Sequence, residues 1–274
     1  MCQEHKDIKY LSRMQEHLTD ALKHFNKDNF VGLFLQGSQN YNLDDEESDV
    51  DTKLIITPSL RDLVMARNPV STTFVRDNDE HIDFKDVRLM LQTFRKQNLN
   101  FVEILFTDFW YMNPDYDEYW QMLVKNREKL ARYNPFAALK AMYGVAMEKY
   151  HALEHRYPSR IPIIDKFGYD PKQLSHMLRV EAFMRDYIDE KPYAVCLKPE
   201  NREELLAIKR GSLDHETARR VADECKKRID DMHAWVEEHV DNYQYIDSDM
   251  EELLLTVQEG IMITSIKNEL KERS

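Results

Sequence analysis

Glycine is scarce in this chain: six glycines in 274 residues is about a third of the usual share of roughly 7%. Such scarcity argues against an all-β protein built on many tight turns. Neither G-x-x-x-x-G-K-[ST] nor G-x-G-x-x-G occurs in the sequence. The P-loop and dinucleotide-binding classes therefore lose their main support.

Cysteine and long apolar runs are also scarce. The three cysteines, at positions 2, 196 and 225, form no C-x-x-C pair, which is typical of a reduced compartment. The N-terminal stretch lacks the apolar segment of a signal peptide, and the longest apolar runs are too short to span a bilayer. We therefore expect a soluble, cytoplasmic protein with no membrane partner.

Positive charge is in the minority, with 38 Lys and Arg against 50 Asp and Glu and a formal net charge of -12. Proteins that coat nucleic acids or anionic membranes are usually basic. We therefore expect no extended DNA binding, although a local basic cleft remains compatible with this composition.

Apolar periodicity predicts an α+β fold. Spacings of three and four indicate a helix over 8–25, and short apolar or alternating runs indicate strands at 30–36, 49–57 and 80–87. A short helix over 60–67 and another from 88 complete this part. The remaining chain carries helical patterns at 116–132, 136–155, 171–189, 201–209, 214–240 and 249–272. We expect a small mixed-sheet α/β domain over 1–112 and an all-helical domain over 113–274.

The most informative stretch is Gly37-Ser38 followed by Asp49 and Asp51. A glycine after a buried strand leaves room for a ligand, and Ser38 offers a hydroxyl and backbone N–H groups. The two-residue period of a strand places Asp49 and Asp51 on one side. Neighbouring carboxylates repel unless a divalent cation neutralises them, and Mg²⁺, or Mn²⁺ in its place, suits carboxylates combined with phosphates. A solvated acidic loop or a weak calcium site is the alternative.

The same stretch resembles a known family. Gly37-Ser38, Tyr41, Leu43, Ser48, Asp49 and Asp51 fit Gly-Ser-x-x-Tyr-x-Leu-x-x-x-x-Ser-Asp-x-Asp, a pattern similar to a bacterial and phage branch of predicted nucleotidyltransferases in the DNA polymerase β superfamily. Residues 169–179 and 204–211 resemble that branch too, so the resemblance spans about 30–235. It implies transfer of a nucleoside monophosphate from an NTP such as ATP to an acceptor hydroxyl, with Mg²⁺ and release of pyrophosphate.

The resemblance also implies a third carboxylate on a later strand. Asp83 and Asp86 both lie on the expected strand 80–87, three residues apart and so on opposite faces. Asp83 is the preferred candidate because it lies mid-strand, whereas Asp86 is placed to cap the next helix. Asp83 would then complete the metal site and act as the base nearest to the acceptor hydroxyl.

A basic helix face is the candidate phosphate-binding surface. Lys172, His176, Arg179 and Phe183 recur at spacings of four, three and four, so they share one face. Charge-assisted hydrogen bonds from this face, with Lys209 added from the next helix, would hold the triphosphate. An ordinary solvated face is the alternative.

The acceptor is not legible in the sequence: a small molecule, a protein hydroxyl and an RNA end all remain open. A nucleotidyltransferase-like antitoxin or interaction protein, which acts by binding a partner, is the alternative from another class. The crowded carboxylates at positions 49, 51 and 83 favour catalysis, because a binding protein has no need of them.

Overall fold

A computed structural model describes residues 3–25, 29–46 and 48–273; Cys2, the polar stretch 26–28 and Glu47 lie outside the described residues. The chain divides into two compact units. The sheet unit contains the described residues of Met1–Asn40, Asp44–Tyr133 and Asp247–Ser274, and the helical unit contains Tyr41–Leu43 and Asn134–Ile246. A small sheet unit combined with a helical unit confirms the predicted α+β fold.

The sheet has five strands in the order β3-β4-β2-β1-β5. Strands β2 and β4 are parallel, and the other neighbours are antiparallel. The sequence predicted three of the strands but missed β3, whose side chains are mostly exposed, and β5, which has three residues. The strand bounds are β1 Phe30–Gln36, β2 Asp51–Ile56, β3 Ser71–Val75, β4 His81–Asp86 and β5 Trp110–Met112.

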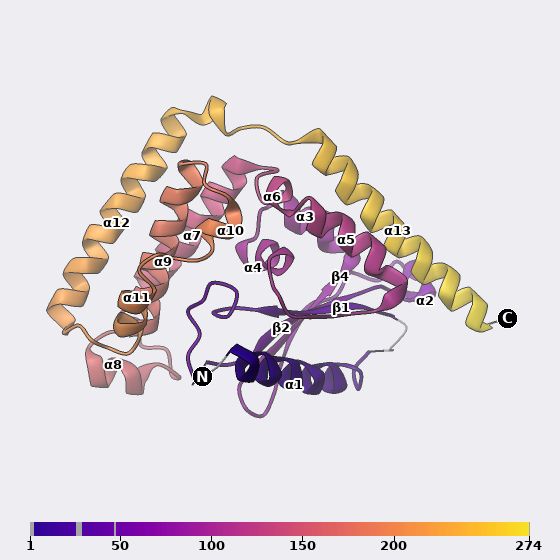
Figure 1. Cartoon of the computed structure of the whole chain (residues 1–274), viewed down its shortest axis with the longest axis horizontal. Coiled ribbons are helices and arrows are strands. Elements are labelled where there is room, and N and C mark those ends of the chain that lie inside the picture. Colours follow the sequence, from indigo (N-terminus) through magenta and orange to yellow (C-terminus); the bar gives the residue numbers. More distant parts are fainter. Residues whose placement is uncertain (1–2, 26–28, 47, 274) are drawn as a thin grey trace. The chain divides into compact units, whose positions relative to one another are not determined.

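The two faces of the sheet carry side chains of different character. One face buries the alternate apolar side chains of β1, β2 and β4 in a core with Tyr10 and Met14 of α1 (Gln3–Ala21). The residues between them point to the opposite face, because successive strand residues alternate. This second face carries Asp51 and Lys53 of β2 and Asp83 of β4, and will be called the polar face. In Figure 1, α1 runs along one side of the sheet, while α3, α5 and α13 lie on the other.

The helices of the sheet unit come from both ends of the chain. Phe34 of β1 stacks on Trp120 of α5, with ring centroids 4.1 Å apart. The last helix, α13, is joined to this unit by a hydrogen bond of 2.8 Å between Ser265 and Thr57. The bounds are α2 Leu60–Val64, α3 Met90–Arg95, α4 Leu99–Val102, α5 Asp117–Lys125, α6 Arg127–Leu130 and α13 Ser248–Arg273, with 3-10 turns η2 Val87–Leu89, η3 Glu103–Leu105 and η4 Pro114–Tyr116.

The two compact units divide the chain differently from the predicted boundary between 112 and 113. Apart from Tyr41–Leu43, the chain leaves the sheet unit after Tyr133 and returns to it at Asp247. The physical reason is that α5 and α13 bury their apolar sides against the sheet unit and against each other. Helical periodicity shows that these segments are helices but does not show what they pack against.

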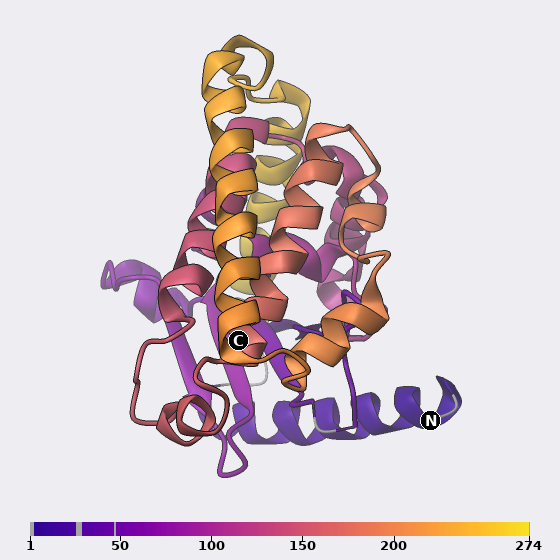
Figure 2. The ribbon, with the colours of Figure 1, turned by 90° about the vertical axis from the view of Figure 1, so that its left-hand side faces the viewer.

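The helical unit is built around α9 (Pro171–Ile188), which packs against α7, α10, α11 and α12. Asp170 caps α9 by accepting a hydrogen bond from the Lys172 N–H. The long α12 runs the length of this unit in Figure 2. Cys196 and Cys225 are buried and form no disulfide bond among the described residues. The remaining bounds are α7 Pro135–Ala152, α8 Ile161–Phe167, α10 Tyr193–Cys196, α11 Arg202–Lys209, α12 His215–Glu238 and η5 Val240–Asn242.

Within the ranges that the structure describes, no helix combines the length and apolar character needed to cross a membrane.

Candidate functional site

The Gly37-Ser38 turn follows β1 directly. Gly37 has a φ of +101°, in the left-handed region that favours glycine. A Cβ added there would meet only the Gln39 Oε1, at 3.5 Å, so backbone conformation rather than lack of space calls for glycine. The Gly37 N–H donates to the Glu103 carboxylate at 2.9 Å, and the Gln39 amide donates to the Asp49 carbonyl at 2.6 Å. The turn is therefore tied to the acidic segment.

The acidic segment presents two carboxylates at the start of β2. Val50 is fully buried in the α1-facing core, whereas Asp49 is exposed and Asp51 is partly exposed. The Asp51 Oδ1 accepts hydrogen bonds from the His81 N–H at 2.9 Å and from its ring Nδ1 at 3.1 Å. The structure therefore leaves both carboxylates accessible to a ligand.

Asp83 lies on the polar face of the neighbouring parallel strand, opposite Lys53 in the register. Its carboxylate accepts from Thr73 Oγ1 at 2.5 Å, Gln36 Nε2 at 3.1 Å and Lys53 Nζ at 3.3 Å. Burial by itself would raise the pKa of Asp83, but the Lys53 charge and these donors outweigh burial and lower it. Asp83 is therefore held as a carboxylate on the same face as Asp51.

Asp86, the alternative third carboxylate, faces the other way. Its side chain is 1% exposed and forms an ion pair of 2.6 Å with Arg88. It also caps η2 by accepting from the Arg88 N–H. The geometry of Asp86 is that of a structural residue, and only Asp83 of the two shares the face of Asp51.

The carboxylates of the sheet unit fit a divalent metal only in part. Among the described residues, no group of three His, Cys, Asp or Glu side chains lies close enough to hold one ion, and Asp83 is paired with Lys53. Asp49 and Asp51 retain oxygens without hydrogen-bond donors in the described part of the chain, and the buried Gln36 Oε1 also has no partner. Two carboxylates with nearby neutral oxygen fit one hydrated Mg²⁺; Asp83 would join them only by giving up Lys53.

Sequence reasoning missed Lys53 and Thr73. Lys53 lies two residues after Asp51, so the strand period that grouped Asp49 with Asp51 already placed Lys53 on the same face. Its side chain is only 6% exposed, which the sequence does not reveal. Thr73 belongs to the strand that the sequence analysis did not find.

A buried network holds the acidic segment from the α1 side of the sheet. Glu80 accepts a hydrogen bond from the Val50 N–H at 3.2 Å. The His17 ring lies between Glu80 and Thr52, 2.9 Å from an oxygen of each. Because Val50 and Thr52 flank Asp51, this network fixes the backbone that presents the catalytic candidates.

Ion pairs and hydrogen bonds to Glu80 strengthen this buried network. Burial would raise the pKa of Glu80, but hydrogen bonds from His17, Arg13 and other donors lower it to about 2. Glu80 also forms ion pairs of 2.5 Å with Arg13 and 3.0 Å with Arg76. Burial lowers the pKa of His17. A single sequence gave no signal for these partners, because they come from three separate segments.

The other predicted residues lie in the helical unit, where they form a basic cluster. Burial lowers the pKa of His176 well below its usual value, and the positive charges of Arg179, Lys172, Lys149 and Lys209 lower it further. Lys149 of α7 was not predicted. The predicted basic residues are therefore close enough to act on one another, and this cluster is an anion-binding candidate within the helical unit.

Arg179 has a second contact within the same unit. Its guanidinium lies 3.9 Å from the centroid of the Tyr41 ring, and its Nε is buried without a hydrogen-bond partner among the described residues. Arg202 donates to the Asn42 carbonyl at 2.7 Å. The segment 41–43 thus packs on the helical unit through two arginines.

Phe183 corrects one expectation. The shared helix face suggested that it lies in an exposed basic stripe, but Phe183 is 3% exposed. Its ring packs against Tyr187 and Tyr193, with centroids 6.3 Å and 5.1 Å away. The reason is that Tyr193 of α10 packs on this part of α9. Phe183 is a core residue and contributes nothing to a ligand site.

Comparisons with known proteins add little to what the geometry of the site shows. No protein-family model matches the chain, and no curated protein matches it either. The chain is similar to a solved structure described as a nucleotidyltransferase-like protein from Exiguobacterium sibiricum 255-15, with 12% identity and a TM-score of 0.26 over 95% of this chain and 78% of that chain. A likeness at that TM-score supports no functional statement.

Proposed function

We propose that the chain is a metal-dependent nucleotidyltransferase that moves a nucleoside monophosphate from an NTP to an acceptor hydroxyl. The observation that carries the proposal is a single arrangement in the sheet unit. The Gly37-Ser38 turn is hydrogen-bonded to the Asp49 segment, and Asp83 stands on the adjacent parallel strand, on the face of Asp51. Transfer of a nucleotidyl group uses carboxylates to bind a divalent cation and to accept a proton, and this arrangement offers candidates for both.

In this proposal, different residues carry out different parts of the reaction. Asp83 accepts the proton of the acceptor hydroxyl as its oxygen forms a bond to the α-phosphorus, and the bond from that phosphorus to the bridging oxygen of pyrophosphate breaks. Three donors already reach Asp83, which leaves about one of its four acceptor positions for the hydroxyl. Asp49 and Asp51 would hold Mg²⁺ or Mn²⁺, which supplies charge neutralisation and polarisation of the α-phosphate.

Lys53 favours the ionised form of Asp83, which is the form that can accept a proton. Its buried ammonium, 3.3 Å from Asp83, favours the ionised carboxylate. The same contact fixes the side chain of Asp83 across two strands. A base that is ionised and positioned before the substrate arrives needs no rearrangement in the reaction.

Separately, we propose that the basic cluster of the helical unit is by itself a polyphosphate-binding surface. Arg179 and the lysines at 149, 172 and 209 all act electrostatically on His176. An NTP carries several negative charges, and cationic donors bind phosphate oxygens by short charge-assisted hydrogen bonds.

A label-transfer assay tests the proposed function. The protein is incubated with Mg²⁺, cell extract and each NTP labelled at the α-phosphate. We expect a labelled acceptor with the wild type and a loss of roughly a hundredfold or more in Asp51→Asn. Asp79→Asn, an equal charge change at an exposed turn position, serves as the control. Undiminished labelling by Asp51→Asn, or no labelled acceptor with the wild type, contradicts the proposal.

A further inference from the structure

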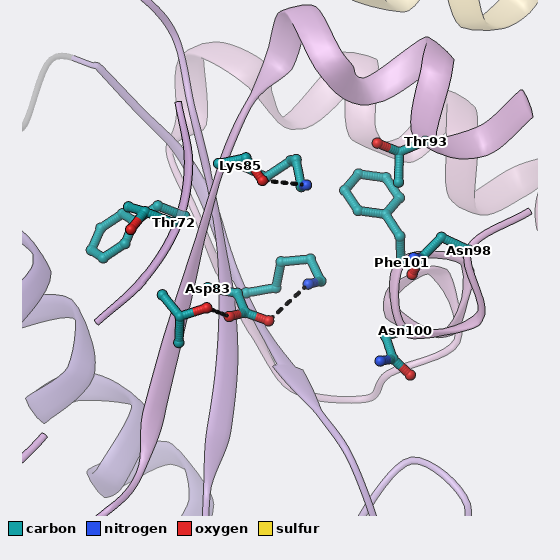
Figure 3. A pocket seen from close by; sticks show the side chains of 11 residues that line it. Thr72, Asp83, Lys85, Thr93, Asn98, Asn100 and Phe101 are labelled. Atoms are coloured by element: carbon teal, nitrogen blue, oxygen red, sulfur yellow. Dashed lines mark hydrogen bonds and ion pairs between the residues drawn. The ribbon is translucent and has the colours of Figure 1, made fainter. Parts of the chain in front are cut away.

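A cavity of about 240 Å³ opens beside Asp83 on the polar face of the sheet. Figure 3 shows Asp83 and Lys85 on β4 facing Thr93, Asn98 and Phe101 across it. All of its lining residues belong to the sheet unit. We call it the Lys85 pocket. Since Asp83 lies in its wall, whatever fills the pocket lies next to the proposed base.

The pocket has an excess of positive charge in a chain of net charge -12. The ammonium groups of Lys53 and Lys85 face one carboxylate, Asp83, and Lys53 already pairs with it. Lys85 donates to the Ser71 hydroxyl at 2.8 Å, and no described carboxylate lies within ion-pair distance of it. Lys85 therefore has the surroundings of a ligand-binding cation rather than of a structural ion pair.

The neighbours of Lys85 make an anion favourable there. Two ammonium groups and one carboxylate line the pocket, and Lys53 is the partner of that carboxylate. A bound anion would offset the remaining positive charge of Lys85. Phosphate and carboxylate groups are the usual anionic partners of lysine.

The opposite wall suits hydroxyl groups. The side-chain amides of Asn98 and Asn100 line the pocket and make no hydrogen bond to another described residue, so they offer both donors and acceptors. Phe101, which is 1% exposed and packs edge-on against Phe94, closes the pocket with an apolar surface. The lining thus combines one anion-binding end with neutral polar groups.

The size of the pocket limits the ligand. Pockets that enclose drug-sized ligands have volumes of roughly 300–1,000 Å³, so about 240 Å³ suits a smaller molecule. Lys85 and Asp83 lie two residues apart on one strand face, so one small ligand can contact both side chains.

We propose that the Lys85 pocket binds the acceptor of the transfer reaction, and that this acceptor is a small hydroxylated molecule with a phosphate or carboxylate group. The inference rests on the proposed function. The anionic group binds Lys85, a hydroxyl donates its proton to Asp83 and attacks the α-phosphorus, and pyrophosphate leaves. A protein hydroxyl or an RNA end is the competing class of acceptor.

Binding measurements without any nucleotide test the pocket. Glycerol 3-phosphate, a small molecule with both a phosphate and free hydroxyl groups, is titrated into the protein by calorimetry. Glycerate is the corresponding probe with a carboxylate group, and glycerol is the uncharged control. We expect saturable one-to-one binding of an anionic probe and none of glycerol; the tighter anion identifies the acceptor's anionic group.

Two variants locate the binding. Lys85→Gln should raise the dissociation constant roughly ten- to a hundredfold, because it removes one charged hydrogen bond. Lys125→Gln removes an exposed lysine of the same unit and should bind as the wild type does. Melting curves check that both variants fold.

Absence of saturable binding of both anions overturns the inference, as does wild-type affinity in Lys85→Gln. Labelling of only proteins or RNA in the extract assay also overturns it, while leaving the nucleotidyltransferase proposal intact. Conversely, anion binding that depends on Lys85 with no label transfer in any extract contradicts the proposed function and not the binding site.

Discussion

Asp83 and Asp86 lie three residues apart on β4 and meet opposite surroundings. Asp83 is open to the Lys85 pocket, whereas the Asp86 carboxylate is buried against Arg88. The strand period predicts the difference in face, but it does not predict which of the two carboxylates is buried. Lys53 and Thr73, on the neighbouring strands, hold Asp83 on the polar face.

The two aspartates should respond differently to the same substitution. Asp83→Asn removes the base, so the single-turnover rate should fall about 10²–10⁴-fold while Mg·NTP binding is retained. It also removes the carboxylate partner of Lys53, whose side chain is only 6% exposed, so the free energy of unfolding should fall as well. Asp86→Asn leaves the Arg88 charge unpaired in a buried site and should lower the free energy of unfolding by about 3 kcal/mol, more than the loss of a cap alone. Rapid-quench kinetics and denaturant titrations measure both; the reverse pattern would assign catalysis to Asp86.

The His17 and Glu80 network predicts loss of stability in acid. The pKa of His17 is lower in the folded chain than its ordinary value of 6.5, so its contribution is complete above pH 6.5 and declines as the pH falls below it. Glu80 titrates at about 2 instead of 4.5, so its contribution is complete above pH 4.5 and is lost on acidification toward pH 2, about 3 kcal/mol in all.

Urea titrations between pH 7 and pH 3 check this prediction. Glu80→Gln should flatten the dependence below pH 4.5, and His24→Gln, at an exposed position on the turn after α1, should leave the wild-type slope. An unchanged slope in Glu80→Gln would show that other groups govern the acid sensitivity.

At the scale of elements, the sequence predicts the helices and strands whose apolar residues recur with a regular period. The helices at 135–152, 171–188, 215–238 and 248–273 agree closely with their apolar patterns. Strand β3 was missed because its side chains are mostly exposed and carry no alternation. The basic residues of α9 were found by spacing, but Phe183 was misplaced because spacing does not show that α10 packs against that part of the helix.

The basic cluster on α9 makes a prediction of its own. Lys172 is exposed, so Lys172→Ala should leave the fold intact and weaken binding of NTP about tenfold, with a smaller effect on NMP because the β- and γ-phosphates are the groups bound. Lys227→Ala, an exposed lysine of α12, is the matched control. Calorimetric titrations measure the affinities. Equal affinities for NTP in Lys172→Ala and the wild type would make the cluster an ordinary surface.

At the scale of the whole molecule, the sheet unit is closed by the last helix of the chain. Leu254 of α13 is fully buried, whereas Leu270 is 50% exposed. Leu254→Ala should lower the free energy of unfolding of the sheet unit by about 2–5 kcal/mol, and Leu270→Ala by less than about 0.5 kcal/mol. Hydrogen exchange measures this: protection should fall in β1, β2 and β4 and persist in α9. An equal loss in both units would contradict the division.

The candidate site was partly predictable for a physical reason. Gly37, Ser38, Asp49 and Asp51 are close in sequence, so local spacing groups them. Lys53 and Asp83 meet only because β2 and β4 are parallel neighbours, and Glu80 reaches Val50 from beyond the end of β3. Such contacts between distant segments depend on strand order, which the pattern of one sequence does not determine.

The most direct test of the central claim compares the position of the label in the NTP. The account predicts that the wild type labels its acceptor from the α-labelled NTP and not from the γ-labelled NTP, releases pyrophosphate in equal amount, and loses both activities in Asp51→Asn and Asp83→Asn but not in Asp79→Asn. Transfer of the γ-label, or equal transfer by the Asp51 and Asp83 variants, would contradict it.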